Sequence, residues 1–213
     1  MRYTTQMIEI LEKLFGSAAK VKIMRLFLFN PQGSFSSADI ARRSQVSESE
    51  AKRTLSLFED IGLIKQRRSI RGNKTPQTNS KKKIKFKGIS TWSINTDFSY
   101  LRQLRELLLY PSPVRDREII NRLARAAKLR LVVLSGVFLQ NLDARIDLLV
   151  VGDGIKKVPL DTTVKKIESE LGREIKYAAF ETADFKYRMN MYDKLIRDIL
   201  DYPHEKILDK IGL

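Results

Sequence analysis

Residues 65–87 constrain this sequence most strongly, because they carry ten Lys or Arg side chains and no Asp or Glu. Stretches that can form β-strands flank a polar middle, residues 71–80, which contains Gly72 and Pro76. This pattern predicts a hairpin with a long tip and a basic surface. Because like charges repel one another, a run of one sign favours a polyanionic partner, and nucleic acid is the obvious polyanion.

The net charge of +15 is concentrated in the N-terminal part of the chain. Residues 1–96 contain 19 Lys or Arg and 7 Asp or Glu, whereas residues 97–213 contain 21 and 18. Without cysteine, the chain has neither disulfides nor thiolate metal ligands. The first residues do not resemble a signal peptide, and no apolar stretch approaches the roughly 20 residues that span a bilayer. We therefore expect a cytoplasmic protein without membrane contact, in which the basic part meets the polyanion.

Apolar periodicity predicts helices over residues 7–15, 18–30, 38–43 and 47–61. Ser37 is the expected cap of the third helix, and Ser47 with Glu50 forms a capping box for the fourth. The fourth helix ends at Gly62, and its expected buried face consists of Ala51, Leu55, Phe58 and Ile61.

Strands are expected on both sides of the polar tip. Leu63 and Ile64 open the first strand, and Ile84 and Phe86 alternate on the returning one. Trp92 and Ile94 alternate again beyond Gly88.

Residues 17–96, and in particular the segment SADIARRSQVSESEAKRTLSLFEDIGLIKQRR, resemble winged helix-turn-helix proteins. The resemblance implies that the capped helix enters the DNA major groove, where Glu48, Ser49, Lys52 and Arg53 are candidates for base contacts. The preceding helix and the hairpin would contact phosphates. The full set of expected DNA-binding residues is Arg42, Arg43, Ser47, Glu48, Ser49, Lys52, Arg53, Arg67, Arg68, Arg71, Lys74, Lys81, Lys82 and Lys83.

Other interpretations of this basic surface stay open. The charged residues would also suit a solvated face, and winged helices serve as protein-docking or RNA-binding modules as well. An acid-free hairpin favours DNA, because a docking module does not need one.

Two amphipathic segments, residues 100–109 and 114–127, are predicted to be helices. They would bridge the two domains or pack onto the second one. The first could also pair with its counterpart in a homodimer.

Residues 128–213 alternate between predicted strands and helices, which favours a small α/β domain. Strands are expected at 129–134, 146–151 and 175–180, and helices at 164–171 and 184–200. The last segment, residues 205–213, would add a short strand or a helix. The whole chain is thus expected to be α+β, with domains at 1–96 and 128–213 joined by a helical linker at 97–127.

The segment LSGVFLQNLDARIDLLVVGD resembles the core motif of nucleotidyltransferases. In that family a Gly-Ser turn binds the triphosphate, and an Asp-x-Asp pair holds magnesium ions. Here the turn is Ser135-Gly136 in reversed order, and Arg145 stands where the first carboxylate would be, two residues before Asp147. Because residues i and i+2 of a strand share a face, Arg145 would place a positive charge beside the cation site.

We therefore expect a degenerate domain without transferase activity and without a cofactor. Its candidate nucleotide-binding residues are Ser135, Gly136, Arg145 and Asp147. It would bind a nucleotide or another small-molecule effector, or serve for dimerisation. The expected function is that of a sequence-specific, homodimeric regulator that binds double-stranded DNA. The alternative is an active nucleotidyltransferase that acts on a nucleic-acid or protein substrate.

Overall fold

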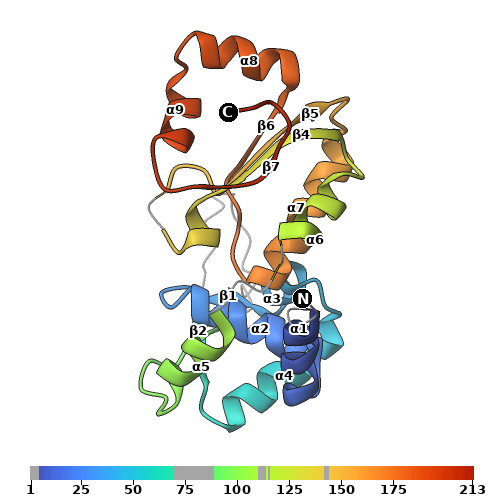
Figure 1. The fold of residues 1–213 in the computed structure, drawn as a ribbon. Coiled ribbons are helices and arrows are strands. Elements are labelled where there is room, and N and C mark those ends of the chain that lie inside the picture. Colours follow the sequence, from blue (N-terminus) through green and yellow to red (C-terminus); the bar gives the residue numbers. More distant parts are fainter. Residues whose placement is uncertain (1–4, 70–88, 110–113, 115, 142–143) are drawn as a thin grey trace, which may run out of the picture. The chain divides into compact units, whose positions relative to one another are not determined.

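A computed structural model of the chain describes residues 5–69, 89–109, 114, 116–141 and 144–213. It forms two compact units, Ile8–Tyr110 and Met1–Met7 with Pro111–Leu213. The first contains helices and a small antiparallel sheet, and the second contains a mixed four-stranded sheet with helices (Figure 1). The expected α+β class is confirmed at this level. None of the helices within the described ranges is long and apolar enough to cross a membrane.

The N-terminal unit begins with helices and ends with a helix that follows its sheet. In chain order its elements are α1 (Thr5–Phe15), α2 (Ala18–Phe29), β1 (Phe35–Ser36), α3 (Ser37–Ser44), α4 (Glu48–Asp60), β2 (Ile64–Ser69), β3 (Ile89–Ile94) and α5 (Leu101–Leu109). The strand order is β1-β3-β2, and both pairs are antiparallel.

Serine caps set where α3 and α4 begin. The Ser47 hydroxyl accepts a hydrogen bond from the backbone N–H of Glu50, which confirms Ser47 as the cap of α4. The described hydrogen bonds include only this half of the predicted capping box, without the reciprocal bond to the Glu50 carboxylate. The predicted cap of α3 was wrong by one residue. Ser36 is the cap, because Asp39 stands three residues after it and completes a capping box, whereas Ser37 is the first helical residue.

The small sheet contains the first strand of the predicted hairpin. β2 pairs with β3 from Ile64 opposite Ile94 to Ser69 opposite Ile89. Trp92 and Ile94 lie on β3 as expected. The predicted strand around Ile84 and Phe86, and the tip at 71–80, lie outside the described residues.

The core of the N-terminal unit is formed by α2, α3, α4 and α5 together with the sheet. Phe27, Ile40, Leu55 and Phe58 are buried there. Ile61 was expected to join them but is 53% exposed, because α4 ends at Asp60 and the chain turns at Gly62.

Helix α5 belongs to this core and is attached to α2. Leu108 and Leu109 are buried in the same apolar cluster. The side chain of Arg25 is also buried, and its Nε donates to the carbonyl of Leu108 at 2.9 Å. The expected linker at 97–127 is thus divided, since α5 lies in the first unit and the next helix in the second.

The C-terminal unit alternates helices with strands. Its elements are α6 (Asp116–Leu123), β4 (Lys128–Leu134), the 3-10 helix η1 (Gly136–Leu139), β5 (Leu148–Asp153), α7 (Lys157–Leu171), β6 (Tyr177–Glu181), α8 (Thr182–Asn190), α9 (Lys194–Leu200) and β7 (Glu205–Asp209). The strand order is β6-β5-β4-β7, in which only β5 and β6 are parallel.

Strands β4 and β5 are the buried centre of this sheet, as their continuous apolar runs predict. Leu131, Val133, Leu149 and Val151 face a cluster that includes residues of α8 and α9. Because side chains alternate along a strand, Val132 and Val150 point to the opposite face. Figure 1 shows α6 and α7 on one side of the sheet and α8 and α9 on the other.

Three expectations for this unit need correction. The helix predicted over 164–171 begins earlier, since α7 spans Lys157–Leu171 and its first turn tolerates Pro159. The helix predicted over 184–200 is broken into α8 and α9, because Tyr192 adopts a left-handed backbone conformation with φ +55°. The helix predicted over 114–127 is shorter, since α6 ends at Leu123 and a turn follows. For residues 205–213 a strand or a helix was expected, and the structure has the strand β7 at Glu205–Asp209.

Candidate DNA-binding surface and C-terminal pocket

Helix α4 presents one polar face to solvent. Ala51, Leu55 and Phe58 are buried on its other face, which leaves Lys52 and Arg53 exposed. Lys52 lies 4.0 Å from Glu48, one helical turn earlier, with both side chains largely exposed. Such a pair is weakly held, so the Lys52 ammonium is available to a ligand.

Near the start of α4, Ser47 and Ser49 are bound to each other through their hydroxyls at 3.1 Å. Arg53 has no ion-pair partner among the residues that the structure describes. Residues 49, 52 and 53 share a face at helical spacing. The α4 residues expected for base contacts are therefore brought together on one exposed surface.

Two arginines expected to bind phosphate lie on α3. Arg42 is 74% exposed, and its guanidinium pairs with Asp39 at 2.8 Å. The Arg43 guanidinium lies over the ring of Phe35, 5.1 Å from the ring centre. Arg42 is therefore directed to solvent, whereas Arg43 is partly held by the sheet.

Asp39 connects the cap of α3 to this surface. The Ser36 hydroxyl hydrogen bond lowers the pKa of Asp39, an effect that burial opposes and that the Arg42 guanidinium strengthens. The carboxylate thus stays charged while it fixes the first turn of α3 and orients Arg42.

The described part of β2 contributes fewer free charges than expected. Lys65 pairs with Asp97 at 3.0 Å, a partner that lies beyond β3 and that no local pattern indicated. Arg67 is exposed, and its carbonyl accepts from the Thr91 hydroxyl. The backbone of Arg68 lies in β2. Arg71, Lys74, Lys81, Lys82 and Lys83 lie outside the described residues.

In the C-terminal unit, Asp147 is buried and bound to the backbone. Its Oδ1 accepts from the N–H of Val137 at 2.8 Å, and its Oδ2 accepts from the N–H of Lys176 at 2.7 Å. Its own carbonyl accepts from the N–H of Ser135 at 2.8 Å. Asp147 therefore holds the turn after β4 against the segment that enters β6.

This environment does not fit a magnesium site of the kind that the nucleotidyltransferase resemblance implies. Each carboxylate oxygen of Asp147 already accepts a backbone hydrogen bond, and Arg145 occupies the position of the first acid of the pair. The described residues contain no group of three or more Asp, Glu, His or Cys side chains that could hold a metal ion.

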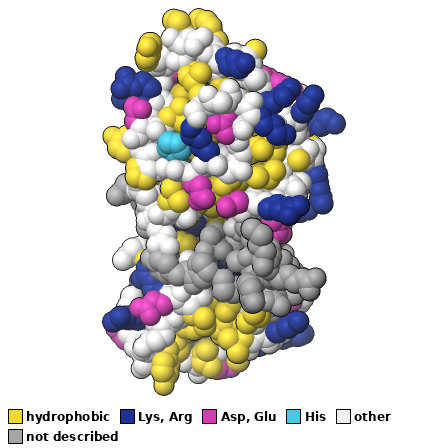
Figure 2. Space-filling model, viewed as in Figure 1, with side chains coloured by type: hydrophobic (Ala, Val, Ile, Leu, Met, Phe, Trp, Pro, Cys, Tyr) yellow, Lys and Arg dark blue, Asp and Glu magenta, His cyan; other side chains and the backbone are white. Residues whose placement is uncertain are grey.

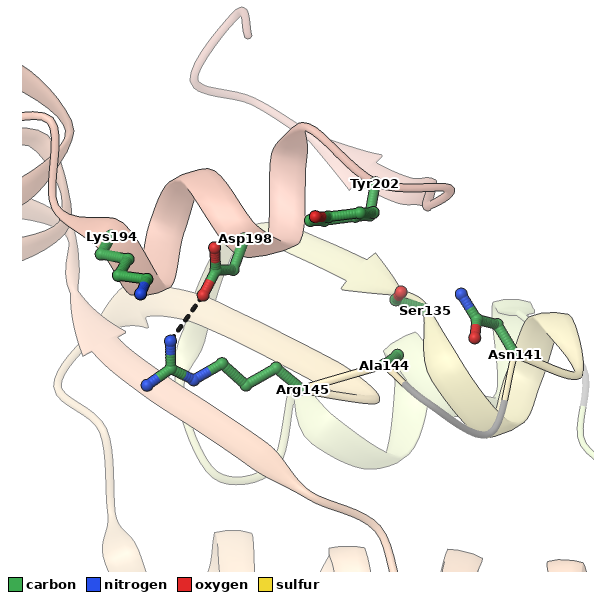
Figure 3. Close-up of a pocket in the computed structure, with 7 residues that line it drawn as sticks. All are labelled: Ser135, Asn141, Ala144, Arg145, Lys194, Asp198 and Tyr202. Atoms are coloured by element: carbon green, nitrogen blue, oxygen red, sulfur yellow. Dashed lines mark hydrogen bonds and ion pairs between the residues drawn. The ribbon is translucent and has the colours of Figure 1, made fainter.

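A polar cavity of about 510 Å³ lies between α9 and the segments that follow β4 and precede β5 (Figure 3). Arg145 reaches across it to Asp198 on α9, with Nη1 and Oδ2 2.5 Å apart. The Ser135 hydroxyl donates to the carbonyl of Pro203 at 3.0 Å. The cavity is lined by Ser135, Asn141, Ala144, Arg145, Lys194, Asp198 and Tyr202.

Two of the four candidate nucleotide-binding residues line this cavity and two do not. Ser135 and Arg145 lie at its wall, whereas Gly136 and Asp147 form the turn beside it. Sequence reasoning missed Lys194, Asp198 and Tyr202. Lys194 and Asp198 are separated by one helical turn, but no motif joins α9 to the distant turn after β4.

The cavity favours an anionic ligand. The Lys194 ammonium points into it (Figure 3) and has no ion-pair partner among the described residues. A ligand anion would compete with Asp198 for Arg145. A second cavity of about 660 Å³ shares Lys194, Asp198 and Tyr202 and adds the exposed ring of Tyr192.

No family model, curated protein or solved structure matches this chain.

Proposed function

We propose that this protein is a sequence-specific DNA-binding transcriptional regulator of the cytoplasm, whose N-terminal unit is a winged helix-turn-helix. The observation that carries the proposal is the exposed face of α4, where Arg53 is exposed and Lys52 is held only by a 4.0 Å contact with Glu48. Helix α4 follows α3 closely, contacts it, and leads directly into the antiparallel pair β2–β3. This order of elements matches the arrangement in which a capped helix lies in the major groove.

Within this proposal, base reading and phosphate binding fall to different residues. Ser49, Lys52 and Arg53 would contact base edges, with Glu48 limiting which bases are accepted, because a carboxylate accepts from cytosine but repels phosphate. Arg42 and the basic residues of 65–87 would contact phosphates and supply most of the affinity.

The C-terminal unit is proposed to be a degenerate nucleotidyltransferase-like domain that senses an anionic ligand and takes no part in catalysis. The backbone hydrogen bonds of Asp147 support this interpretation, because they leave its oxygens committed to the fold. The pair Arg145–Asp198 and the free ammonium of Lys194 provide the anion-binding groups.

A homodimer is proposed because paired half-sites multiply sequence specificity. Large apolar side chains are exposed on the N-terminal unit, among them Ile10 and Leu14 on α1 and Leu107 on α5. Ile10 and Leu14 are one helical turn apart, a spacing that suits helix pairing. Figure 2 shows apolar side chains gathered on one face of this unit.

A competition assay tests the DNA-binding proposal. A labelled duplex would be bound by the full chain and challenged with an excess of unlabelled duplex or structured RNA. We expect duplex DNA to displace the probe at lower concentration than RNA. Preferential displacement by RNA, or no binding of the duplex, would overturn the proposal.

A transfer assay tests the inactive C-terminal unit. The wild-type chain would be incubated with labelled nucleoside triphosphates and magnesium, with DNA, RNA and protein as acceptors. We expect no incorporation of label. Transfer by the wild-type chain would establish the enzyme alternative.

A further inference from the structure

A group of unpaired basic side chains lies on the C-terminal unit, away from the residues assigned above. Two segments carry it, residues 125–128 from the turn after α6 to the start of β4, and residues 156–157 at the start of α7. Figure 2 shows Lys and Arg side chains gathered on this part of the unit. The group, here called the α7 cluster, consists of Arg125, Lys128, Lys156 and Lys157.

Backbone hydrogen bonds and strand pairing hold the two segments together. The N–H of Lys156 donates to the carbonyl of Ala126 at 2.8 Å. Lys128 pairs in register with Asp153, at the ends of β4 and β5. The backbone of Gly152 lies so close to that of Lys128 that a Cβ added to Gly152 would be 2.8 Å from the Lys128 carbonyl oxygen. The backbone positions that carry the basic side chains are therefore fixed by the fold.

The neighbouring carboxylates are already engaged. Asp153 accepts from Nε of Arg130 at 2.9 Å. The Glu181 carboxylate accepts from the N–H groups of Gly154 and Ile155 at 3.1 and 2.9 Å. All four side chains of the α7 cluster are exposed, and none lies within ion-pair distance of a carboxylate among the residues described. Lys128 is attracted by Asp153 without direct contact, and that carboxylate is shared with Arg130. The cluster is thus a local excess of positive charge in a unit whose total charge is nearly balanced.

We propose that the α7 cluster is a second nucleic-acid contact, which binds the phosphate backbone of duplex DNA without regard to sequence. Exposed cations on adjoining segments suit a polyanion, because each of them can approach a phosphate group. An anionic membrane is the less suitable partner. Beside these segments, in the part of the chain that the structure describes, the one large apolar side chain that is exposed is Val158 in the first turn of α7. Membrane-surface helices need a broad apolar face.

The proposal does not depend on α4 being a reading helix, and one experiment separates the two. Binding of a mixed-sequence duplex would be measured by fluorescence anisotropy over a range of NaCl concentrations. The variants are Lys156→Gln/Lys157→Gln and Arg125→Gln/Lys128→Gln. The control, Lys176→Gln/Lys186→Gln, removes the same charge at exposed positions elsewhere on the unit.

Each cluster variant should weaken binding and make the log–log salt slope shallower by about 1–2, since each phosphate contact contributes roughly 0.9. The control should keep most of the wild-type slope. If the cluster variants behave like the control, the α7 cluster is not a DNA contact, whatever Lys52 and Arg53 do. Stronger binding to single-stranded RNA or to phosphatidylserine vesicles than to the duplex would also overturn the proposal.

Discussion

The carboxylate of Asp147 fills the space that a side chain at residue 136 would need, because a Cβ built on Gly136 would lie 1.9 Å from its Oδ1 atom. Gly136 also has a φ of +53°, which side-chain-bearing residues rarely adopt. The tight turn and the buried acid therefore depend on each other. Asp147 therefore stabilises the fold.

Gly136→Ala should lower the free energy of unfolding by about 2–4 kcal/mol, through backbone strain and the displaced carboxylate. Gly154→Ala is the control, since Gly154 has a φ of +67° with nothing within 4 Å of an added Cβ. It should cost only about 1 kcal/mol. Urea denaturation measures both, and equal losses would contradict the role given to Asp147.

The hydrogen bonds that cap α3 predict that stability depends on pH through Asp39. They also predict different effects for substitution of Ser36 and of Ser37. Because the pKa of Asp39 is lowered in the folded protein, its contribution to stability is present above its ordinary pKa and is lost as pH falls through the folded value. Ser36→Ala should raise the pKa of Asp39 towards its usual range. It should also cost about 1 kcal/mol of stability near neutral pH.

Ser37→Ala is the matched control, because Ser37 is the first residue of α3 and Ser36 is its cap. NMR titration of the Asp39 carboxyl group measures the pKa in each variant. The cap would be assigned to the wrong residue if Ser37→Ala changed the pKa of Asp39, or if Ser36→Ala left this pKa unchanged.

The ion pair across the C-terminal pocket predicts opposite effects of its two members on anion binding. Asp198→Asn should strengthen binding of pyrophosphate several-fold, because it frees Arg145 from its 2.5 Å contact and removes a negative charge. Arg145→Gln and Lys194→Gln should weaken it. Isothermal titration calorimetry without added metal measures these affinities. Weaker binding by Asp198→Asn would mean that the pocket does not receive the anion at Arg145.

If the basic residues of 65–87 bind phosphates and α4 reads bases, substitutions in the two segments should cause two different DNA-binding defects. Neutralising Lys81, Lys82 and Lys83 should weaken binding to all sequences and make the salt slope shallower by about 1–3. Lys52→Ala or Arg53→Ala should alter the preference among sequences. Anisotropy with a panel of duplexes measures both. The assignment of phosphate binding and base reading to different segments would be wrong if the two sets of variants behaved alike.

Local patterns were sufficient for much of the fold. The spacing of Ala51, Leu55 and Phe58 gave the buried face of α4, and Ser47 gave its start. The continuous apolar runs gave the central strands β4 and β5. The cap of α3 was misplaced because Ser36 and Ser37 are both competent caps, and only the position of Asp39 distinguishes them.

The sites depended more on contacts between distant segments. Asp147 finds its partners in the backbone of Val137 and Lys176, which a side-chain motif does not reveal. The pocket joins Arg145 to Asp198, more than 50 residues later. The sequence does not indicate the α7 cluster, because the unit contains nearly as many carboxylates as cations. Only the fold shows which carboxylates form ion pairs or hydrogen bonds with other groups.

Selection of bound fragments from a random duplex library by the full chain tests most directly whether the protein reads DNA sequence through α4. If α4 reads DNA, the selection should enrich a defined sequence that is repeated as two half-sites. Lys52→Ala/Arg53→Ala should change that sequence, and the exposed α7 control Lys165→Ala/Lys166→Ala should preserve it. Failure to enrich any sequence, or enrichment of the same sequence by the α4 variant, would contradict the claim that α4 reads DNA.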